Sequence, residues 1–538
     1  MYDEEFKAFE EELFETLMER NPHLATFIGI HRYDHLLPDG SLEKHMGDMK
    51  FMEEAFERLK GFDPKKLSPE NRYYREVGMH AMELMLFQEK ELGYWKKNPS
   101  VPDVIGGSLF PLLKRDFAPF EERLESIRKR IECVPEFVES SKSSLVEPKR
   151  LWVEMAMESV QQLPMLFKLI MMIAHGLGVG QEKLEELNAA IQKADESLEG
   201  YGEWLESKLE EADDDYVLGE ELFDQLIEKR GLGYTAQEIL ELGERYFRET
   251  EENMKKYAGE IDPEKDVWEV LDQITSEYPS NIEEALEWYK KGLEEAKEFI
   301  TEKDLCTIPE NEEIEVTETP EYMRHLIPFA AYMGPAKFDE VKKGIYLVTP
   351  PPTDDGWKKM SYWDVRNTTV HEGYPGHHLQ ISCATTVDDY LIMFSSAIET
   401  IEGWAHYCEE MMKEHGFDDT PEARLIQNRD VLWRAARIIV DVKLSTGKMS
   451  FDEAVDFLVD KVKLQRPNAV AEVRRYTQNP AYQLSYLLGK HMLLELRDEI
   501  KKKMGTDYSE KFFHDTILYA GSVPMKYLRQ RLMDSSES

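Results

Sequence analysis

The chain has 538 residues and a formal net charge of −41, because 107 acidic side chains outnumber 66 basic ones. A surface this negative repels phosphate backbones and anionic lipids, so nucleic acids and membranes are not expected as partners. Hydrophobic residues make up 42% of the chain, which excludes a fully disordered protein and allows a large packed core.

Three features of the sequence bear on location. The N-terminal residues lack the basic start and apolar run of a secretory signal, and have the pattern of an acidic amphipathic helix. The longest apolar stretch, around residues 166–174, is interrupted by Lys168 and is too short to cross a bilayer. The 4 cysteines are well separated and form no CxxC pair, which indicates reduced thiols. A cytoplasmic location is therefore predicted.

Most of the predicted elements are helices. Apolar residues recur every three or four positions over residues 6–17, 124–131 and 184–191, and charged residues fill the gaps. The glycine-rich segment 176–180 follows an apolar helical run and lacks the Lys and Ser/Thr of a phosphate-binding loop. It predicts the end of a helix.

Strand patterns are scarce and lie in the middle of the chain. Residues 314–317 and 344–349 have the best of them. Residues 306–320, with two prolines and acidic pairs, form the best candidate boundary. The sequence thus predicts a mainly α protein with a small sheet near the helical segment that contains residues 371–378, described next. We expect an N-terminal helical region, 1–305, and a C-terminal region, 306–538, with one continuous helical domain as the alternative.

A histidine-rich segment carries the clearest chemical signal. It contains His371, Glu372, His377 and His378. In zinc hydrolases imidazoles bind the metal, while a neighbouring carboxylate takes a proton from water. Such histidines usually lie four residues apart on one helix face, but position 375 here is a proline.

Helix geometry leaves two choices for the second histidine ligand. His378 would share a helix face with His371, but seven residues rise about 10.5 Å, which is long for two ligands of one ion. His377 would fit if Pro375 and Gly376 made the helix bulge. We favour His377, with His378 as the alternative.

The third ligand is predicted to be Glu402, about 25 residues further along. The neighbouring Gly403 and Ala405 would let its helix approach the histidine helix closely. His406 lies one turn after Glu402 on the same face, where it would either support the ligands or contact the substrate, or else be a partly buried structural histidine. Cys383 and Cys408 fall in apolar helical segments and are expected to be inert thiols.

The C-terminal part supplies candidates for a second stabiliser of the oxyanion that forms when water attacks a carbonyl. The sequence favours Arg475 and Tyr476, and Arg474 or Arg475 would suit the terminal carboxylate of a peptide. The further candidates are Tyr482, Tyr486 and His491.

Several blocks together resemble the domain of unknown function 885 (DUF885) family. The most specific is HEGYPGHHLQ at 371–380; the others lie at 21–26, 29–34, 402–405, 475–476, 483–486 and 489–490. The family is similar to zincin-type metallopeptidases, and its helical body resembles the carboxypeptidase Taq family. The resemblance implies His371, His377 and Glu402 as ligands and Glu372 as base. Two departures stand out: the carboxypeptidase Taq histidines are four apart, and the position of His406 is usually aliphatic in this family.

The expected function is that of a zinc-dependent peptidase in which Glu372 activates water. Cobalt or manganese could replace zinc. The expected substrate is a short peptide and the expected action that of a carboxypeptidase, with endopeptidase and dipeptidase action as alternatives. A metal-dependent amidase or deacylase and an inactive helical binding protein are the competing hypotheses. A homodimer is left open.

Overall fold

The computed structural model describes residues 2–324, 327, 330–351 and 354–536, and these residues form two compact units. Unit 1 contains residues 1–216 and 336–340; unit 2 contains 217–335 and 341–538. Residues 306–320, where the sequence has its best candidate boundary, run within unit 2. No helix among the described residues is long and apolar enough to cross a membrane.

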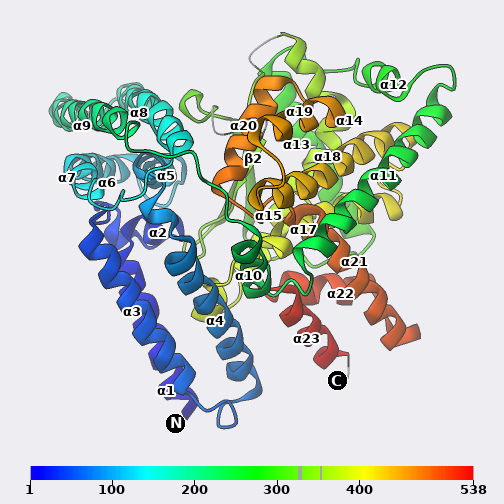
Figure 1. Ribbon diagram of the computed structural model, residues 1–538, viewed down its shortest axis with the longest axis horizontal. Coiled ribbons are helices and arrows are strands. Elements are labelled where there is room, and N and C mark those ends of the chain that lie inside the picture. The colour runs from blue at the N-terminus through cyan, green and yellow to red at the C-terminus, as the bar shows by residue number, and fades with distance from the viewer. Residues whose placement is uncertain (1, 325–326, 328–329, 352–353, 537–538) are drawn as a thin grey trace. The chain divides into compact units, whose positions relative to one another are not determined.

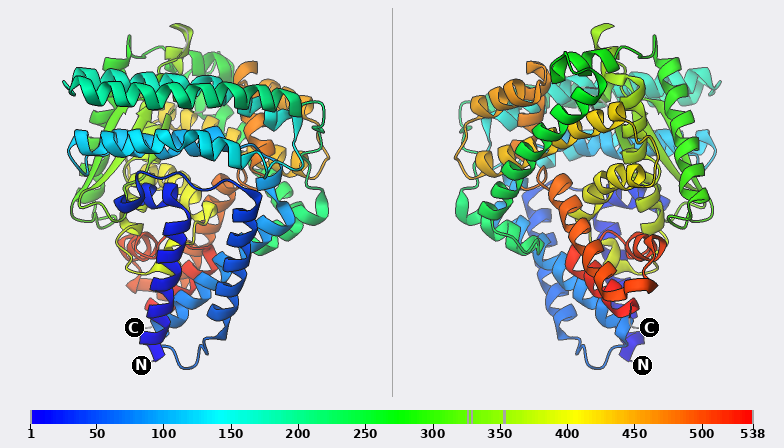
Figure 2. Two further views of the ribbon diagram at one scale, coloured as in Figure 1. Left: turned by 90° about the vertical axis from the view of Figure 1, so that its left-hand side faces the viewer. Right: turned by 90° about the vertical axis from the view of Figure 1, so that its right-hand side faces the viewer.

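Unit 1 is built from helices whose apolar faces form its core. They are α1 (Tyr2–Arg20), α2 (Pro22–Phe27), α3 (Leu42–Gly61), α4 (Pro69–Phe87), α5 (Val101–Lys114), α6 (Phe120–Glu132), α7 (Val134–Ser141), α8 (Arg150–Gly176) and α9 (Gln181–Lys208). The long helices α8 and α9 run side by side (Figure 2). The glycine-rich segment 176–180 joins them, as predicted, with Gly178 at a φ of +75°.

A short loop from later in the chain completes unit 1. Residues 336–340 pack directly against Gly29. The φ of Gly29 is +91°, and a side chain at this position would collide with Asp339. His31 lies between two carboxylates, with Nδ1 2.8 Å from Asp34 and Nε2 3.0 Å from Asp339. Its ring stacks on Phe117 at 3.4 Å. Burial acts to lower the pKa of His31, but the bonds to Asp339 and Asp34 raise it to about 9.

Unit 2 holds the remaining helices. They are α10 (Glu220–Arg230), α11 (Ala236–Ile261), α12 (Val267–Ile274), α13 (Ile282–Glu302), α14 (Tyr362–Glu372), α15 (His377–Ala384), α16 (Tyr390–Met393), α17 (Ile398–Glu414), α18 (Pro421–Ser445), α19 (Phe451–Val462), α20 (Arg466–Gln478), α21 (Ser485–Met504), α22 (Glu510–Leu518) and α23 (Met525–Ser535). Helix α11 lies along α18 (Figure 1), and Gly243 gives Ile438 room at their contact.

A three-stranded sheet completes unit 2, in the order β1 (Glu312–Glu318), β3 (Lys342–Val348), β2 (Ala330–Met333). Strand β3 pairs in parallel with β1, and antiparallel with β2. The two predicted strands correspond to β1 and β3. The sheet packs near the histidine segment through α13, whose Tyr289 ring lies 5.2 Å from the Tyr346 ring of β3. The protein is therefore mainly α with one small sheet, as predicted.

Candidate metal centre

His371 is the penultimate residue of α14. This helix begins with a capping box in which Ser361 and Asp364 exchange side-chain to backbone hydrogen bonds. Gly292 of α13 lies opposite Thr369 and lets α13 pack closely on the last turns of α14. The packing leaves His371 only 5% exposed.

The helix does not continue through the histidine segment. It ends at Glu372, and residues 373–376 form a turn with a cis peptide bond between Tyr374 and Pro375. The Gly376 N–H donates to the Val370 carbonyl at 3.1 Å, and a Cβ on Gly376 would lie 1.9 Å from the His371 oxygen. The predicted bulge within one helix is therefore wrong. Two helices meet at a tight turn, and the second begins at His377.

This turn brings three predicted ligands together. One ligand atom each from His371, His377 and Glu402 lie within 4.8 Å of one another. Glu402 Oε2 is 3.2 Å from His377 Nε2 and 3.8 Å from His371 Nε2. The Oε2 atom is buried and has no aligned hydrogen-bond donor among the described residues. Two imidazoles and a carboxylate are a donor set that zinc prefers.

The charges at this cluster favour a cation. Burial acts to raise the pKa of Glu402, but the adjacent imidazoles of His377 and His371 hold it well below its usual range. Burial acts to lower the pKa of His371, but Glu402 and Glu409 raise it to about 9. The carboxylates thus create a negative potential that stabilises positive charge between them.

Glu409 forms a hydrogen bond to the side of the His371 ring that faces away from Glu402, and it was not among the residues predicted from the sequence. Its Oε1 is 2.8 Å from His371 Nδ1, and its side chain is fully buried. Arg434 and Asn367 donate to Glu409 at 3.3 and 3.0 Å. A bond at Nδ1 leaves Nε2 to face Glu402. The spacing contained a signal, because Glu409 lies seven residues after Glu402 and so on the same face of α17.

Two tyrosines near the start of α21 contact the cluster. The Tyr482 hydroxyl donates to Glu402 Oε1 at 2.9 Å, which leaves Oε2 facing the histidines. The Tyr486 ring lies parallel to His371 at 6.4 Å. Both tyrosines were among the further candidates from the sequence, which favoured Arg475 and Tyr476.

The two favoured C-terminal residues form a neighbouring group. The Tyr476 hydroxyl donates to Glu472 at 2.7 Å and accepts from Arg437 Nε at 3.1 Å. Arg475 donates to the same glutamate at 3.0 Å. His491 lies 3.0 Å from the Tyr246 hydroxyl.

The two other histidines of these segments, His378 and His406, lie outside the cluster of three ligands and contact other residues. His378 is fully buried and bonds to Glu312 and Tyr332 through its two ring nitrogens. His406 is also fully buried, and burial lowers its pKa to about 3, so it is a neutral ring beside Glu409. Glu372 is half-buried and has no hydrogen bond or ion pair within the described part of the chain.

Helix α17 approaches its neighbours differently from the prediction. It packs against α14 and α15, but Gly403 contacts Gly489 of α21, where a Cβ would lie 2.5 Å from the glycine backbone. On the side of the turn, Trp404 Nε1 donates to the Pro375 carbonyl at 2.8 Å. The absence of a side chain at Gly403 therefore allows α17 to pack closely against α21.

The cysteines lie outside the cluster. Cys383 and Cys408 are buried, and burial raises the pKa of both thiols, that of Cys383 to about 12. They remain protonated at neutral pH, as expected for inert thiols.

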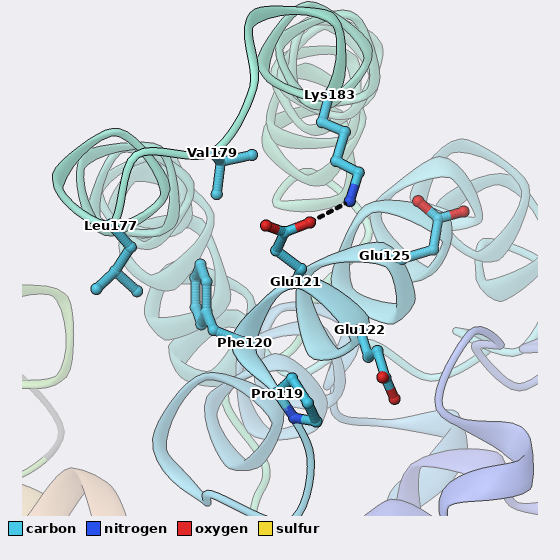
Figure 3. Close-up of a pocket in the computed structure, with 8 residues that line it drawn as sticks. All are labelled: Pro119, Phe120, Glu121, Glu122, Glu125, Leu177, Val179 and Lys183. Carbon is cyan, nitrogen blue, oxygen red and sulfur yellow. Dashed lines mark hydrogen bonds and ion pairs between the residues drawn. The ribbon is translucent and has the colours of Figure 1, made fainter.

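Unit 1 has a surface pocket of a different character (Figure 3). Phe120, Leu177 and Val179 provide its apolar side, and Glu121 pairs with Lys183 at 2.6 Å. None of the residues that line it is a histidine or cysteine, as far as the structure describes them. The candidate metal ligands His371, His377 and Glu402 all lie in unit 2.

Two solved structures have a fold similar to that of this chain. A lipoprotein candidate of unknown function from Shewanella oneidensis has a similar structure, with a TM-score of 0.79 and 22% identity over 98% of this chain and 99% of that one. A candidate lipoprotein from Colwellia psychrerythraea has a TM-score of 0.86 and 18% identity over 100% and 99% of the two chains. No curated protein matches. Residues 22–532 match the family described as "Bacterial protein of unknown function (DUF885)", so the chain belongs to that family.

Proposed function

We propose that the protein is a zinc-dependent peptidase of the zincin type, similar in its catalytic plan to the carboxypeptidase Taq family. The observation that carries the proposal is the convergence of His371, His377 and Glu402 within 4.8 Å, next to the half-buried Glu372. A purely structural cluster has no need of a free carboxylate at that position.

The donor set fits zinc, with cobalt or manganese as substitutes. A bound zinc ion would polarise a carbonyl oxygen and lower the pKa of water. His371 and His377 would hold it through Nε2, and Glu402 through Oε2. Glu409 keeps His371 oriented, since its carboxylate bonds to Nδ1 at 2.8 Å.

Glu372 is the general base of this proposal. It takes a proton from the attacking water and passes it to the leaving amine, so one residue serves both steps. Tyr482 lies beside the ligand Glu402, with its hydroxyl 2.9 Å from Oε1, and is our first candidate for a phenol that turns to the developing oxyanion. Tyr476 remains a second candidate for this role. Its hydroxyl accepts a hydrogen bond from Arg437, which together with Arg475 and Glu472 forms what we call the arginine group.

The arginine group supports carboxypeptidase action on short peptides. Arg437 and Arg475 share the single carboxylate of Glu472, so the group keeps a net positive charge. Arg437 stacks between the rings of Trp433 and Tyr486, at 4.3 and 4.7 Å. Tyr486 in turn lies over His371. A free peptide carboxylate is the anion that such guanidinium groups hold well.

The test is a mass-spectrometric digest of a mixed peptide pool by the zinc-loaded protein, with the Glu372→Gln variant as control. Loss of single C-terminal residues in the wild-type sample alone supports both mechanism and carboxypeptidase action. Internal cuts would keep the mechanism and discard the exopeptidase. Intact peptides with bound zinc would favour an amidase or deacylase; intact peptides without zinc would favour a binding protein.

The location is tested separately. The sequence predicts the cytoplasm, whereas the two structural neighbours are described as candidate lipoproteins. Cell fractionation distinguishes these cases, because a lipid-anchored protein sediments with membranes and a cytoplasmic one stays in the supernatant.

A further inference from the structure

His378 is the conspicuous histidine that the proposed metal centre does not use. Both of its ring nitrogens are occupied: Nδ1 accepts from the Tyr332 hydroxyl at 2.8 Å, and Nε2 donates to Glu312. The carboxylate partner assigns the proton to Nε2. Since His378 directly follows His377, whatever holds His378 also restrains the neighbouring ligand.

Glu312 is the centre of these restraints. It is the first residue of β1, and its side chain is 2% exposed. Its Oε2 atom accepts from His378 and also from the Tyr374 hydroxyl at 2.5 Å, while Lys297 of α13 donates to Oε1 at 2.5 Å. Burial acts to raise the pKa of Glu312, but these three donors lower it to about 2, so the carboxylate is ionised.

The arrangement matters because the two histidine ligands lie on different helices. In a single helix, backbone hydrogen bonds fix the spacing of residues four apart. Here the spacing of His371 and His377 depends on the turn 373–376. Glu312 binds Tyr374 inside this turn and His378 just beyond it, through the same oxygen atom. Trp404 holds the Pro375 carbonyl.

We infer that Glu312, acting through His378 and Tyr374, is a positioning residue that sets His377 against His371 and thereby determines the affinity for the metal ion. The inference rests on the proposed metal centre. It also gives the small sheet a role, because the first residue of β1 anchors the turn between the two histidine ligands.

The experiment measures zinc affinity of the full chain, stripped of metal, by competition with a chromophoric chelator. Glu312→Gln should weaken zinc binding about 10- to 100-fold, because a neutral amide oxygen accepts these hydrogen bonds more weakly than an ionised carboxylate, and the amide NH2 would oppose one of the three donors. Tyr374→Phe removes one hydroxyl and should weaken binding less. Glu313→Gln changes the next, exposed glutamate of β1 and should leave the affinity unchanged.

Two further readouts separate positioning from plain stability. The cobalt(II) absorption spectrum should change in Glu312→Gln, and the melting temperature of each metal-free variant reports its folding. Wild-type zinc affinity in a less stable Glu312→Gln protein would overturn the inference. If that variant does not fold, wild-type affinity in Tyr374→Phe overturns it instead. A wild-type chain that binds no zinc would reject the proposed metal centre itself, and the inference with it.

Discussion

Glu372 is the side chain on which the proposed chemistry depends most directly. Replacing it with glutamine keeps the shape but removes the base, so peptide hydrolysis should fall about 10²- to 10⁴-fold. Zinc content should stay at the wild-type level, because Glu372 is not among the three converging ligands. Activity assays with metal analysis check both expectations. Glu298→Gln, on an exposed site of α13, is the matched control. Full activity in Glu372→Gln would reject its role as base.

Glu409 acts on the centre through His371. Glu409→Gln removes the charge that orients this ring, so zinc affinity should fall about 10- to 100-fold. The half-buried Arg434 would also lose an ion pair of 3.3 Å with the fully buried Glu409, so the melting temperature should fall as well. Chelator competition and thermal unfolding measure the two effects. Unchanged zinc affinity would mean that Glu409 stabilises Arg434 and Asn367 but does not orient His371.

The tyrosines can be compared by removing one hydroxyl at a time. Tyr482→Phe should lower kcat about tenfold or more, because this hydroxyl lies beside the ligand Glu402. Tyr476→Phe should mainly raise KM, since its hydroxyl supports Arg437 and Glu472. Steady-state kinetics on a short peptide decide between them. A larger loss of kcat in Tyr476→Phe would favour the residue that the sequence analysis preferred.

The sequence predicted the side chains that share a local motif better than those that meet across helices. His371, Glu372 and His377 lie in one short segment, and Glu402 belongs to a second one that small residues make conspicuous. Glu409 and Glu312 contact the segment from α17 and β1. Glutamates are the commonest residues of this acidic chain, so the spacing from Glu402 is only a weak signal for Glu409, and Glu312 is distinguished by its tertiary contacts alone.

At the scale of elements, the crossing of α17 and α21 brings two helix backbones into close contact near the centre. Gly489→Ala would place a Cβ 2.0 Å from the Glu399 carbonyl oxygen, so the helices would have to separate. We expect a destabilisation of about 1–3 kcal/mol. Gly259→Ala, in an open site of α11, should instead be neutral or stabilising by about 0.5–1 kcal/mol. Denaturant unfolding tests the pair, and equal stability of both variants would contradict the packing argument.

The periodicity of the sequence predicted which segments are helices, but it did not predict how consecutive elements are joined. The 3.6-residue repeat identified the long helices, and the two short strand patterns at 314–317 and 344–349 identified β1 and β3. Strand β2 has only four residues, Ala330–Met333, and its pairing with β3 decides its structure. The turn at Pro375 was expected as a bulge because sequence spacing alone does not show where a helix restarts.

At the scale of the whole molecule, His31 provides a pH-dependent contribution to the stability of unit 1. Its pKa is raised from 6.5 to about 9, so the protonated form is bound more tightly in the folded state. This stabilisation is complete below about pH 6.5 and is lost as the pH rises through about 9. The free energy of unfolding of the wild type should exceed that of His31→Gln by about 1–2 kcal/mol at pH 6, after allowance for solvent screening. A difference that persists undiminished at pH 10 would contradict this account.

The loop 336–340 also constrains the order of events during synthesis. The main part of unit 1 ends at residue 216, and its last piece arrives about 120 residues later. At 5–20 residues per second, a ribosome needs about 6–24 s to make that stretch. During this interval Gly29 and His31 lack their contacts with Asp339 and are exposed to solvent. Helices α1 to α9 have already been synthesised, whereas the loop 336–340 that packs on them has not. A nascent chain stalled before residue 336 would therefore be more sensitive to protease around His31 than one stalled well after residue 340.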